Sequence, residues 1–281
     1  MMQAIVQAAA DFEEHGFVVM RQWLDAASIA CLSREVSRIH ARWLAEDEAA
    51  FIEQGLVNMH SLTNPRYFDD REQRRRFFEL VLPHRLTSLV EGMFGEGIYF
   101  HNTQLFFNPH NSAQQPYWHR DLQYSPLDDA AQAAELGRML SLHIRIPLLP
   151  EQGIDVIPGT HKRWDTALET AVRKELDGHV NSEELPGALR IALEPGDVLV
   201  FDAQMLHRGH YASNRERMAL DVCAGRAHPF TSPYLDGDNL PDDDEIAHIR
   251  NNHWYVRAKH LVTACRCSDA STGTELNRAP D

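Results

Sequence analysis

The repeat of apolar residues changes from helical to strand-like at Gly97, and this change limits the folds that the chain can adopt. Before Gly97, apolar residues recur at steps of three and four, which is typical of helices with one buried face. After Gly97, apolar and polar residues alternate in short runs separated by turns, as in half-buried antiparallel strands. The sequence therefore predicts a helical N-terminal part, about residues 1–95, packed on one sheet of a β core.

The N-terminal part contains helix signals with a clear physical origin. Residues 3–15 form an amphipathic run that ends at Gly16, and residues 17–20 follow as a short strand. Asp25 is a suitable N-cap for the next helix, and residues 83–94 form another. The apolar residues of the helix after Asp25 fall on one face: Ile29, Leu32, Val36, Ile39 and Trp43.

The β core is expected at about residues 96–228. Its strands are predicted at residues 98–107, 116–123, 139–148, 188–193, 198–202, 205–211 and 217–224, with partly helical insertions at 124–138 and 159–187. Strands covered by N-terminal helices indicate an α+β, mainly β chain with a jelly-roll or cupin-type core, that is, a double-stranded β-helix. We expect a single domain over residues 1–281, with a C-terminal extension at 229–281.

The charge and the cysteines of the chain limit its partners. A net charge of −14 argues against nucleic acid, because binding to a phosphate backbone needs Lys and Arg. No apolar run is long enough to cross a bilayer, and the N-terminus lacks the basic region of a secretory signal. Four cysteines are too few for a disulfide framework. We expect a cytoplasmic monomer or homodimer that acts on a small molecule and contacts neither nucleic acid nor membrane.

One short motif carries a specific chemical signal. His119 and Asp121 form the only His-x-Asp among sixteen histidines. In a strand, side chains two apart emerge on the same face and can bind one cation together, and His207 can supply a third ligand from a later strand. Two histidines and one carboxylate around a metal with open positions are typical of non-haem Fe(II) oxygenases. A hydrogen-bonded structural histidine is the alternative interpretation of the tripeptide alone.

Six segments follow one another along the chain in a recognisable order. They are residues 12–19, 118–122 (Trp-His-Arg-Asp-Leu), 157–162 (Ile-Pro-Gly-Thr-His-Lys), 195–201 (Pro-Gly-Asp-Val-Leu-Val-Phe), 205–209 (Met-Leu-His-Arg-Gly) and 217–220 (Arg-Met-Ala-Leu). Together they resemble the phytanoyl-CoA dioxygenase family of Fe(II)/2-oxoglutarate-dependent oxygenases. The resemblance covers most of the chain and is carried by the order of the segments more than by any one of them.

The resemblance implies a function and its residues. His119, Asp121 and His207 would bind Fe(II), 2-oxoglutarate and O₂ would be co-substrates, and Arg217 would pair with the distal carboxylate of 2-oxoglutarate. The default reaction would be hydroxylation of an unactivated C–H bond of a small-molecule metabolite, with release of succinate and CO₂. The carboxylate of Asp121 favours oxygenation, because related enzymes with Gly or Ala at that position are halogenases. Two alternatives remain: a cupin-like metalloprotein with non-oxidative chemistry, and a catalytically silent binding protein of the same fold.

More than one arginine is a candidate for the partner of the distal carboxylate of 2-oxoglutarate. The fork of a guanidinium matches a carboxylate bidentately, so a buried arginine on a core strand is a natural partner of 2-oxoglutarate. We favour Arg217, because the alternation of its strand puts it on the face that carries Asp221 and two small side chains. Arg208 and Arg215 compete for the role.

The third metal ligand and the hydroxyl contact to 2-oxoglutarate each have alternative candidates. His210 competes with His207 as the third ligand but lies on the opposite strand face if the pairing is regular. Gly209 stands where members of the family often carry a hydroxyl side chain. Thr160 or Ser141 would then supply the hydroxyl contact to 2-oxoglutarate.

The chain alternates strictly between residues 139 and 146. Ser141, His143 and Arg145 form one face, opposite Leu142 and its apolar neighbours. A polar strand face usually meets solvent, but in a small barrel covered by helices it can line the cavity instead. At the position that aligns with His143, the phytanoyl-CoA dioxygenase family that the chain resembles has an aromatic residue, which helps to hold 2-oxoglutarate. We predict that His143 points inward and donates to a carboxylate of the co-substrate, with Ser141 and Arg145 lining the same cavity.

Overall fold

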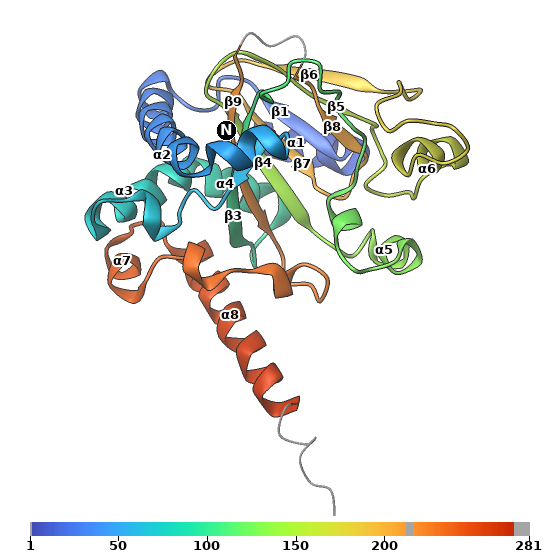
Figure 1. Cartoon of the computed structure of the whole chain (residues 1–281). Coiled ribbons are helices and arrows are strands. Elements are labelled where there is room, and N and C mark those ends of the chain that lie inside the picture. Colours follow the sequence, from blue (N-terminus) through green and yellow to red (C-terminus); the bar gives the residue numbers. More distant parts are fainter. Residues whose placement is uncertain (1, 212–215, 273–281) are drawn as a thin grey trace, which may run out of the picture.

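The computed structural model describes residues 2–211 and 216–272, and the side chains of those residues up to 264 (Figure 1). Within them, two antiparallel sheets form the β part of a mixed α/β molecule: six strands in the order β1-β7-β4-β9-β3-β2, and three in the order β6-β5-β8. The strands are β1 (Phe17–Met20), β2 (Asn58–His60), β3 (Tyr99–Phe107), β4 (Ser141–Pro147), β5 (Glu151–Val156), β6 (Leu189–Leu193), β7 (Val198–Asp202), β8 (His207–Gly209) and β9 (Met218–Gly225). Most neighbouring strands are far apart in the sequence, so long-range pairing builds both sheets.

The helices gather outside the sheets. The α-helices of the described chain are α1 (Met2–His15), α2 (Ala26–Glu53), α3 (Arg71–Val81), α4 (His84–Phe94), α5 (Asp129–Glu135), α6 (Ala167–Arg173), α7 (Asp243–His248) and α8 (His253–Thr272). Short 3₁₀ helices are η1 (Pro65–Tyr67), η2 (Asp121–Tyr124), η3 (Ser232–Tyr234) and η4 (Gly237–Asn239). In Figure 1, α2, α3 and α7 lie on one side of the molecule, and α5 and α6 lie on the other. None of the helices within the described residues has the length and apolar character of a bilayer-spanning segment.

The start of α2 confirms the prediction made from its sequence. The Asp25 carboxylate accepts a hydrogen bond of 2.8 Å from the backbone N–H of Ser28, a cap that stabilises a helix by about 1 kcal/mol. The five apolar residues predicted for the buried face are the buried residues of this helix.

The N-terminal helices cover one face of the larger sheet, as predicted. Leu142, Ile144 and Ile146 of β4 belong to one buried apolar cluster with residues of α1, α2, α3 and α4. His143 and Arg145 alternate with them and line a cavity on the opposite side. The two faces of β4 therefore separate the helix-covered core from a polar interior.

Described segments after residue 229 pack against the helical layer. Arg74 of α3 pairs with Glu245 of α7 at 2.8 Å, and both side chains are buried. The ring of Tyr255 in α8 lies 4.9 Å from the rings of both Phe78 and Phe100. The described part of the C-terminal extension therefore belongs to the same core. Cys265 and Cys267 form a Cys-x-Cys without a second pair, which indicates two ordinary thiols rather than a metal or redox site, and their side chains lie outside the described part.

The strand predicted at residues 116–123 is wrong. Only His119 makes a β-bridge there, and Asp121–Tyr124 is the 3₁₀ helix η2. The guanidinium of Arg120 is buried and donates to the carboxylate of Asp165, at 2.9 Å from Nε and 2.7 Å from Nη2. The ion pair gives the buried charge of Arg120 its partner, and the chain leaves its extended course directly after this residue.

The sequence does not predict β5 or the short strand β2. The pairing of β5 with β6 is irregular between Glu151 and Ile154, so apolar and polar residues do not alternate along β5. The irregularity contains Gly153, whose φ is +73°. A strand that contains such a bulge does not show the period of two that sequence patterns detect.

We expect Gly153→Ala to lower the free energy of unfolding by more than about 1 kcal/mol. A Cβ at this position would lie 1.8 Å from the carbonyl oxygen of Ile191, and its positive φ favours glycine. Urea unfolding measures the loss. Gly137→Ala is the matched control, because a Cβ there meets no atom within 4 Å, and its expected change is within about 0.5 kcal/mol. Equal stability of the two variants would contradict the bulge.

Candidate active site

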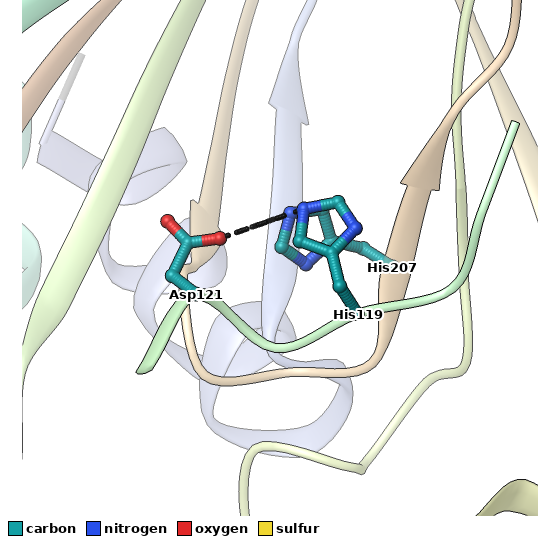
Figure 2. A group of neighbouring side chains, drawn as sticks. All are labelled: His119, Asp121 and His207. Atoms are coloured by element: carbon teal, nitrogen blue, oxygen red, sulfur yellow. Dashed lines mark ion pairs between the residues drawn. The ribbon is translucent and has the colours of Figure 1, made fainter. Parts of the chain in front are cut away.

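His119, Asp121 and His207 converge from different local structures. The backbones of His119 and His207 form a β-bridge, with N···O distances of 2.9 and 3.0 Å, and their ring centroids are 4.2 Å apart. Figure 2 shows the Asp121 carboxylate on one side of the two imidazoles. Its Oδ1 lies 3.7 Å from Nε2 of His119 and 3.5 Å from Nε2 of His207. One ligand atom of each residue lies within 4.8 Å of the others.

The two histidines present a nitrogen lone pair to this centre. Nδ1 of His119 faces the carbonyl oxygen of Tyr117 at 3.1 Å, and Nδ1 of His207 faces that of Met205 at 2.9 Å. A carbonyl only accepts, so each ring carries its hydrogen on Nδ1 and leaves Nε2 available for a metal. Burial lowers the pKa of both rings, that of His207 to about 3, so both imidazoles are neutral at pH 7.

Asp121 completes the donor set as an ionised carboxylate. Burial alone would raise the pKa of Asp121, but the charge and the hydrogen bond of His143 hold that pKa below its usual value. Its Oδ2 lies 2.8 Å from Nε2 of His143, which leaves Oδ1 toward the other two histidines. Two neutral imidazoles and one carboxylate are the donors that hold Fe(II) with open positions. The three residues therefore fit a divalent iron.

The three groups border a cavity of about 310 Å³. Much of its wall was not found by sequence reasoning: Asn58, His60, Gln104, Tyr117, Tyr124 and Tyr211. The register of β2 with β3 pairs His60 with Gln104 and Asn58 with Phe106, so these four side chains share a face. No local pattern marks them, because the wall exists only after β2 has paired with β3.

Arg217 lies beside this centre, just before β9, with a fully buried side chain. Its Nε donates to Oε2 of Glu151 at 2.9 Å. The two terminal nitrogens have no hydrogen-bond partner among the described residues. Because a guanidinium fork binds a carboxylate through two parallel hydrogen bonds, the arrangement fits the distal carboxylate of 2-oxoglutarate. Glu151, which holds the arginine, was not found by sequence reasoning.

The competing candidates that the structure describes, Arg208 and His210, do not line the cavity. Arg208 donates to Asp155 at 2.9 Å and does not line the cavity. His210 also lies near Asp155, with its Nδ1 4.0 Å from Oδ2 of that residue, and is absent from the cavity wall. Arg215 lies outside the described residues.

His143 points inward and Leu142 outward, as predicted. His143 and Arg145 line the cavity, whereas Leu142 belongs to the helix-covered core. The expected hydrogen bond from His143 to a co-substrate carboxylate does not fit, because both ring nitrogens are occupied. Nε2 lies 2.8 Å from Oδ2 of Asp121, and Nδ1 lies 2.8 Å from Oδ2 of Asp221. Burial alone would lower the pKa of His143, but its acidic neighbours raise that pKa well above its usual value.

Neither Ser141 nor Thr160 lines this cavity, so the prediction for Thr160 is corrected and the contact of Ser141 with 2-oxoglutarate stays a prediction. Ser141 borders a second cavity, of about 190 Å³, which also touches Asp121 and His143. The Thr160 hydroxyl donates to the carbonyl of Ile157 at 2.6 Å and accepts from the N–H of Leu206 at 2.9 Å. It therefore ties the turn that follows β5 to the segment that carries His207, and it is not directed at a co-substrate.

Known proteins resemble the chain in sequence. A match to the phytanoyl-CoA dioxygenase (PhyH) family extends over residues 12–219. The ectoine dioxygenase of Sphingopyxis alaskensis is 24% identical over 218 residues, which are 71% of this chain and 68% of that protein. The ectoine dioxygenase of Nocardia farcinica is 23% identical over 213 residues, 70% of this chain and 69% of that protein.

Solved structures share the fold. SnoN, a non-haem alpha-ketoglutarate-dependent epimerase from nogalamycin biosynthesis, matches with a TM-score of 0.54 and 19% identity, over 83% of this chain and 87% of that one. EctD from S. alaskensis, solved with 2-oxoglutarate and 5-hydroxyectoine, matches with a TM-score of 0.54 and 20% identity, over 78% of this chain and 75% of that one. At these identities the structures show a common architecture only. The family match extends over residues 12–219 and therefore includes His119, Asp121 and His207. The chain belongs to the phytanoyl-CoA dioxygenase (PhyH) family of Fe(II)- and 2-oxoglutarate-dependent oxygenases.

Proposed function

We propose that this protein is a dioxygenase that hydroxylates an unactivated C–H bond of a small-molecule metabolite. In the proposed reaction, R–H, O₂ and 2-oxoglutarate give R–OH, succinate and CO₂, so one oxygen atom enters the product and the other enters succinate. One observation carries the proposal: a two-histidine, one-carboxylate set shares a cavity with an arginine whose terminal nitrogens are unpaired among the described residues.

Different residues of the cavity would bind the iron and the co-substrate. His119, Asp121 and His207 would hold the iron, which supplies the activation of oxygen when it is bound. Three protein ligands leave the other positions of an octahedron open for the co-substrates. Arg217 would bind the distal carboxylate of 2-oxoglutarate, and Glu151 keeps its guanidinium in place. Buried N–H groups without partners are costly, so a carboxylate that satisfies them gains binding energy.

The wall on the side of β2 and β3 favours an uncharged, polar substrate. Asn58 donates to Oε1 of Gln104 at 3.3 Å, and desolvation in the cavity lowers the pKa of the adjacent His60, which favours the neutral imidazole. Of the described residues in the wall, the two arginines are Arg145, which is paired with Asp221, and Arg217, which would bind 2-oxoglutarate. Among the described residues, the wall therefore offers no further arginine or lysine for the phosphates of an acyl-CoA.

We further propose that residues 1–281 form one catalytic domain with a double-stranded β-helix core. Its support is that strands of both sheets border the same cavity and that α7 and α8 pack on the common core. Cys31 and Cys223 are free thiols, which favours a reducing compartment, and we propose the cytoplasm.

Anaerobic addition of Fe(II) and 2-oxoglutarate tests the proposed function. We expect a weak visible charge-transfer band that requires both, because it arises from 2-oxoglutarate bound to the iron. A cupin-like metalloprotein would bind metal without this band, and a silent binding protein would bind neither iron nor 2-oxoglutarate at this centre. Once the band is established, succinate formation from a panel of neutral and phosphorylated metabolites identifies the substrate; a response to phosphorylated compounds alone would contradict the neutral wall.

A further inference from the structure

Four ionisable side chains form a hydrogen-bonded chain that ends on Asp121. His143 lies between two carboxylates, with Nε2 2.8 Å from Oδ2 of Asp121 and Nδ1 2.8 Å from Oδ2 of Asp221. Arg145 donates to both oxygens of Asp221, at 2.7 Å from Nε and 3.0 Å from Nη2. The side chain of Asp121 is 29% exposed, whereas those of the other three residues are at most 5% exposed. The chain therefore connects a rigid interior to the candidate metal centre.

The larger sheet fixes the orientation of the His143 ring. His143 pairs with Phe201 of β7 on one side and with Cys223 of β9 on the other. The Phe201 ring stacks on the imidazole, with centroids 5.0 Å apart and planes inclined by 21°. Asp221 is two residues from Cys223 and so shares its strand face, which brings its carboxylate diagonally to Nδ1. These contacts direct Nε2 at Asp121.

We propose that His143 is a positioning residue that makes Asp121 a one-oxygen ligand of the iron, an inference that rests on the function proposed above. A carboxylate can bind a metal through one oxygen or through both. His143 occupies Oδ2, so Oδ1 is the oxygen that faces Nε2 of His119 and His207.

The number of ligand atoms matters for the reaction. Three protein atoms leave three positions of an octahedron, enough for two donor atoms of 2-oxoglutarate and for O₂. A second oxygen from Asp121 would compete for one of these positions. His143 thus keeps a position open for the co-substrates without contacting them.

A purely structural role for His143 predicts a different response to substitution. If the ring only packs on Phe201, then His143→Phe should be tolerated better than His143→Gln. If its hydrogen bond to Asp121 matters, then His143→Gln should preserve the site, because an amide can donate to Oδ2, and His143→Phe should not. His101→Phe is the matched control. His101 is also on a strand of the larger sheet, and its ring faces the hydroxyl of Tyr99 at 3.4 Å.

The experiment is an anaerobic titration of the full-length protein with Co(II) and then with 2-oxoglutarate. The visible bands of Co(II) report its coordination number, and thermal unfolding verifies that each variant is folded. We expect wild type, His143→Gln and His101→Phe to share one Co(II) spectrum and a similar affinity for 2-oxoglutarate. For His143→Phe we expect a changed spectrum and a Kd for 2-oxoglutarate raised roughly 10- to 100-fold, as is typical when a metal ligand loses its hydrogen-bond partner.

Each outcome has a definite meaning. A His143→Phe protein that matches wild type, or a His143→Gln protein that is equally impaired, would overturn the role of His143 and leave the proposed function intact. A wild-type protein that binds neither Co(II) nor 2-oxoglutarate would overturn the proposed function itself. A crystal structure of the Co(II)-loaded wild type tests the inference without any substitution. Coordination through Oδ1 with Oδ2 still bonded to His143 is expected, and coordination through both oxygens would overturn the inference.

Discussion

His207→Ala is expected to abolish the conversion of 2-oxoglutarate to succinate and to weaken iron binding. The variant loses one of three protein ligands, so its loss of affinity should exceed the roughly 10- to 100-fold effect of removing a hydrogen-bond partner of a ligand. The fold should survive, because the β-bridge between His207 and His119 uses backbone atoms only. Calorimetric titration with Fe(II) under anaerobic conditions measures the affinity, and succinate formation measures the turnover.

His210→Ala is the control for this variant. His210 follows β8 and does not line the cavity. We expect this protein to bind iron and to turn over 2-oxoglutarate like wild type. Wild-type turnover in a metal-loaded His207→Ala protein, or loss of iron binding in His210→Ala only, would show that the third ligand is misassigned.

Arg217→Ala should weaken the binding of 2-oxoglutarate by about 2–5 kcal/mol, because the distal carboxylate would be left buried without a partner. This corresponds to a rise in Kd of roughly 30-fold to several thousand-fold. Iron binding should change little, since Arg217 contacts Glu151 and not the three candidate ligands. Titration of the Fe(II)-loaded protein with 2-oxoglutarate, followed at the charge-transfer band, measures the effect.

Arg190→Ala is the matched control for the arginine. Arg190 of β6 is also in an ion pair, with Asp155 at 2.9 Å, but it does not line the cavity. Its removal should leave the Kd for 2-oxoglutarate unchanged. An unchanged Kd in Arg217→Ala would place the distal carboxylate on another cation and would contradict the assignment of the unpaired guanidinium nitrogens.

Features that depend on neighbouring residues in the chain were predictable. The N-cap at Asp25 and the buried stripe of α2 act within a few turns of one helix, so the sequence revealed both. The alternation along β4 likewise revealed which side chains point inward, His143 among them. The candidate metal ligands could be named because His119 and Asp121 are close in sequence and the family pattern supplied His207.

Features that depend on strand pairing were not predictable. Residues 116–123 look like a strand, but the chain turns into η2 after Arg120, whose buried ion pair with Asp165 joins segments 45 residues apart. The partners of the cavity arise in the same way. Glu151 meets Arg217 across 66 residues, and His143 meets Asp221 across 78. A buried charge must have a partner, but which charge it meets follows from the register of the sheets, and register is a property of the folded molecule that no local pattern contains.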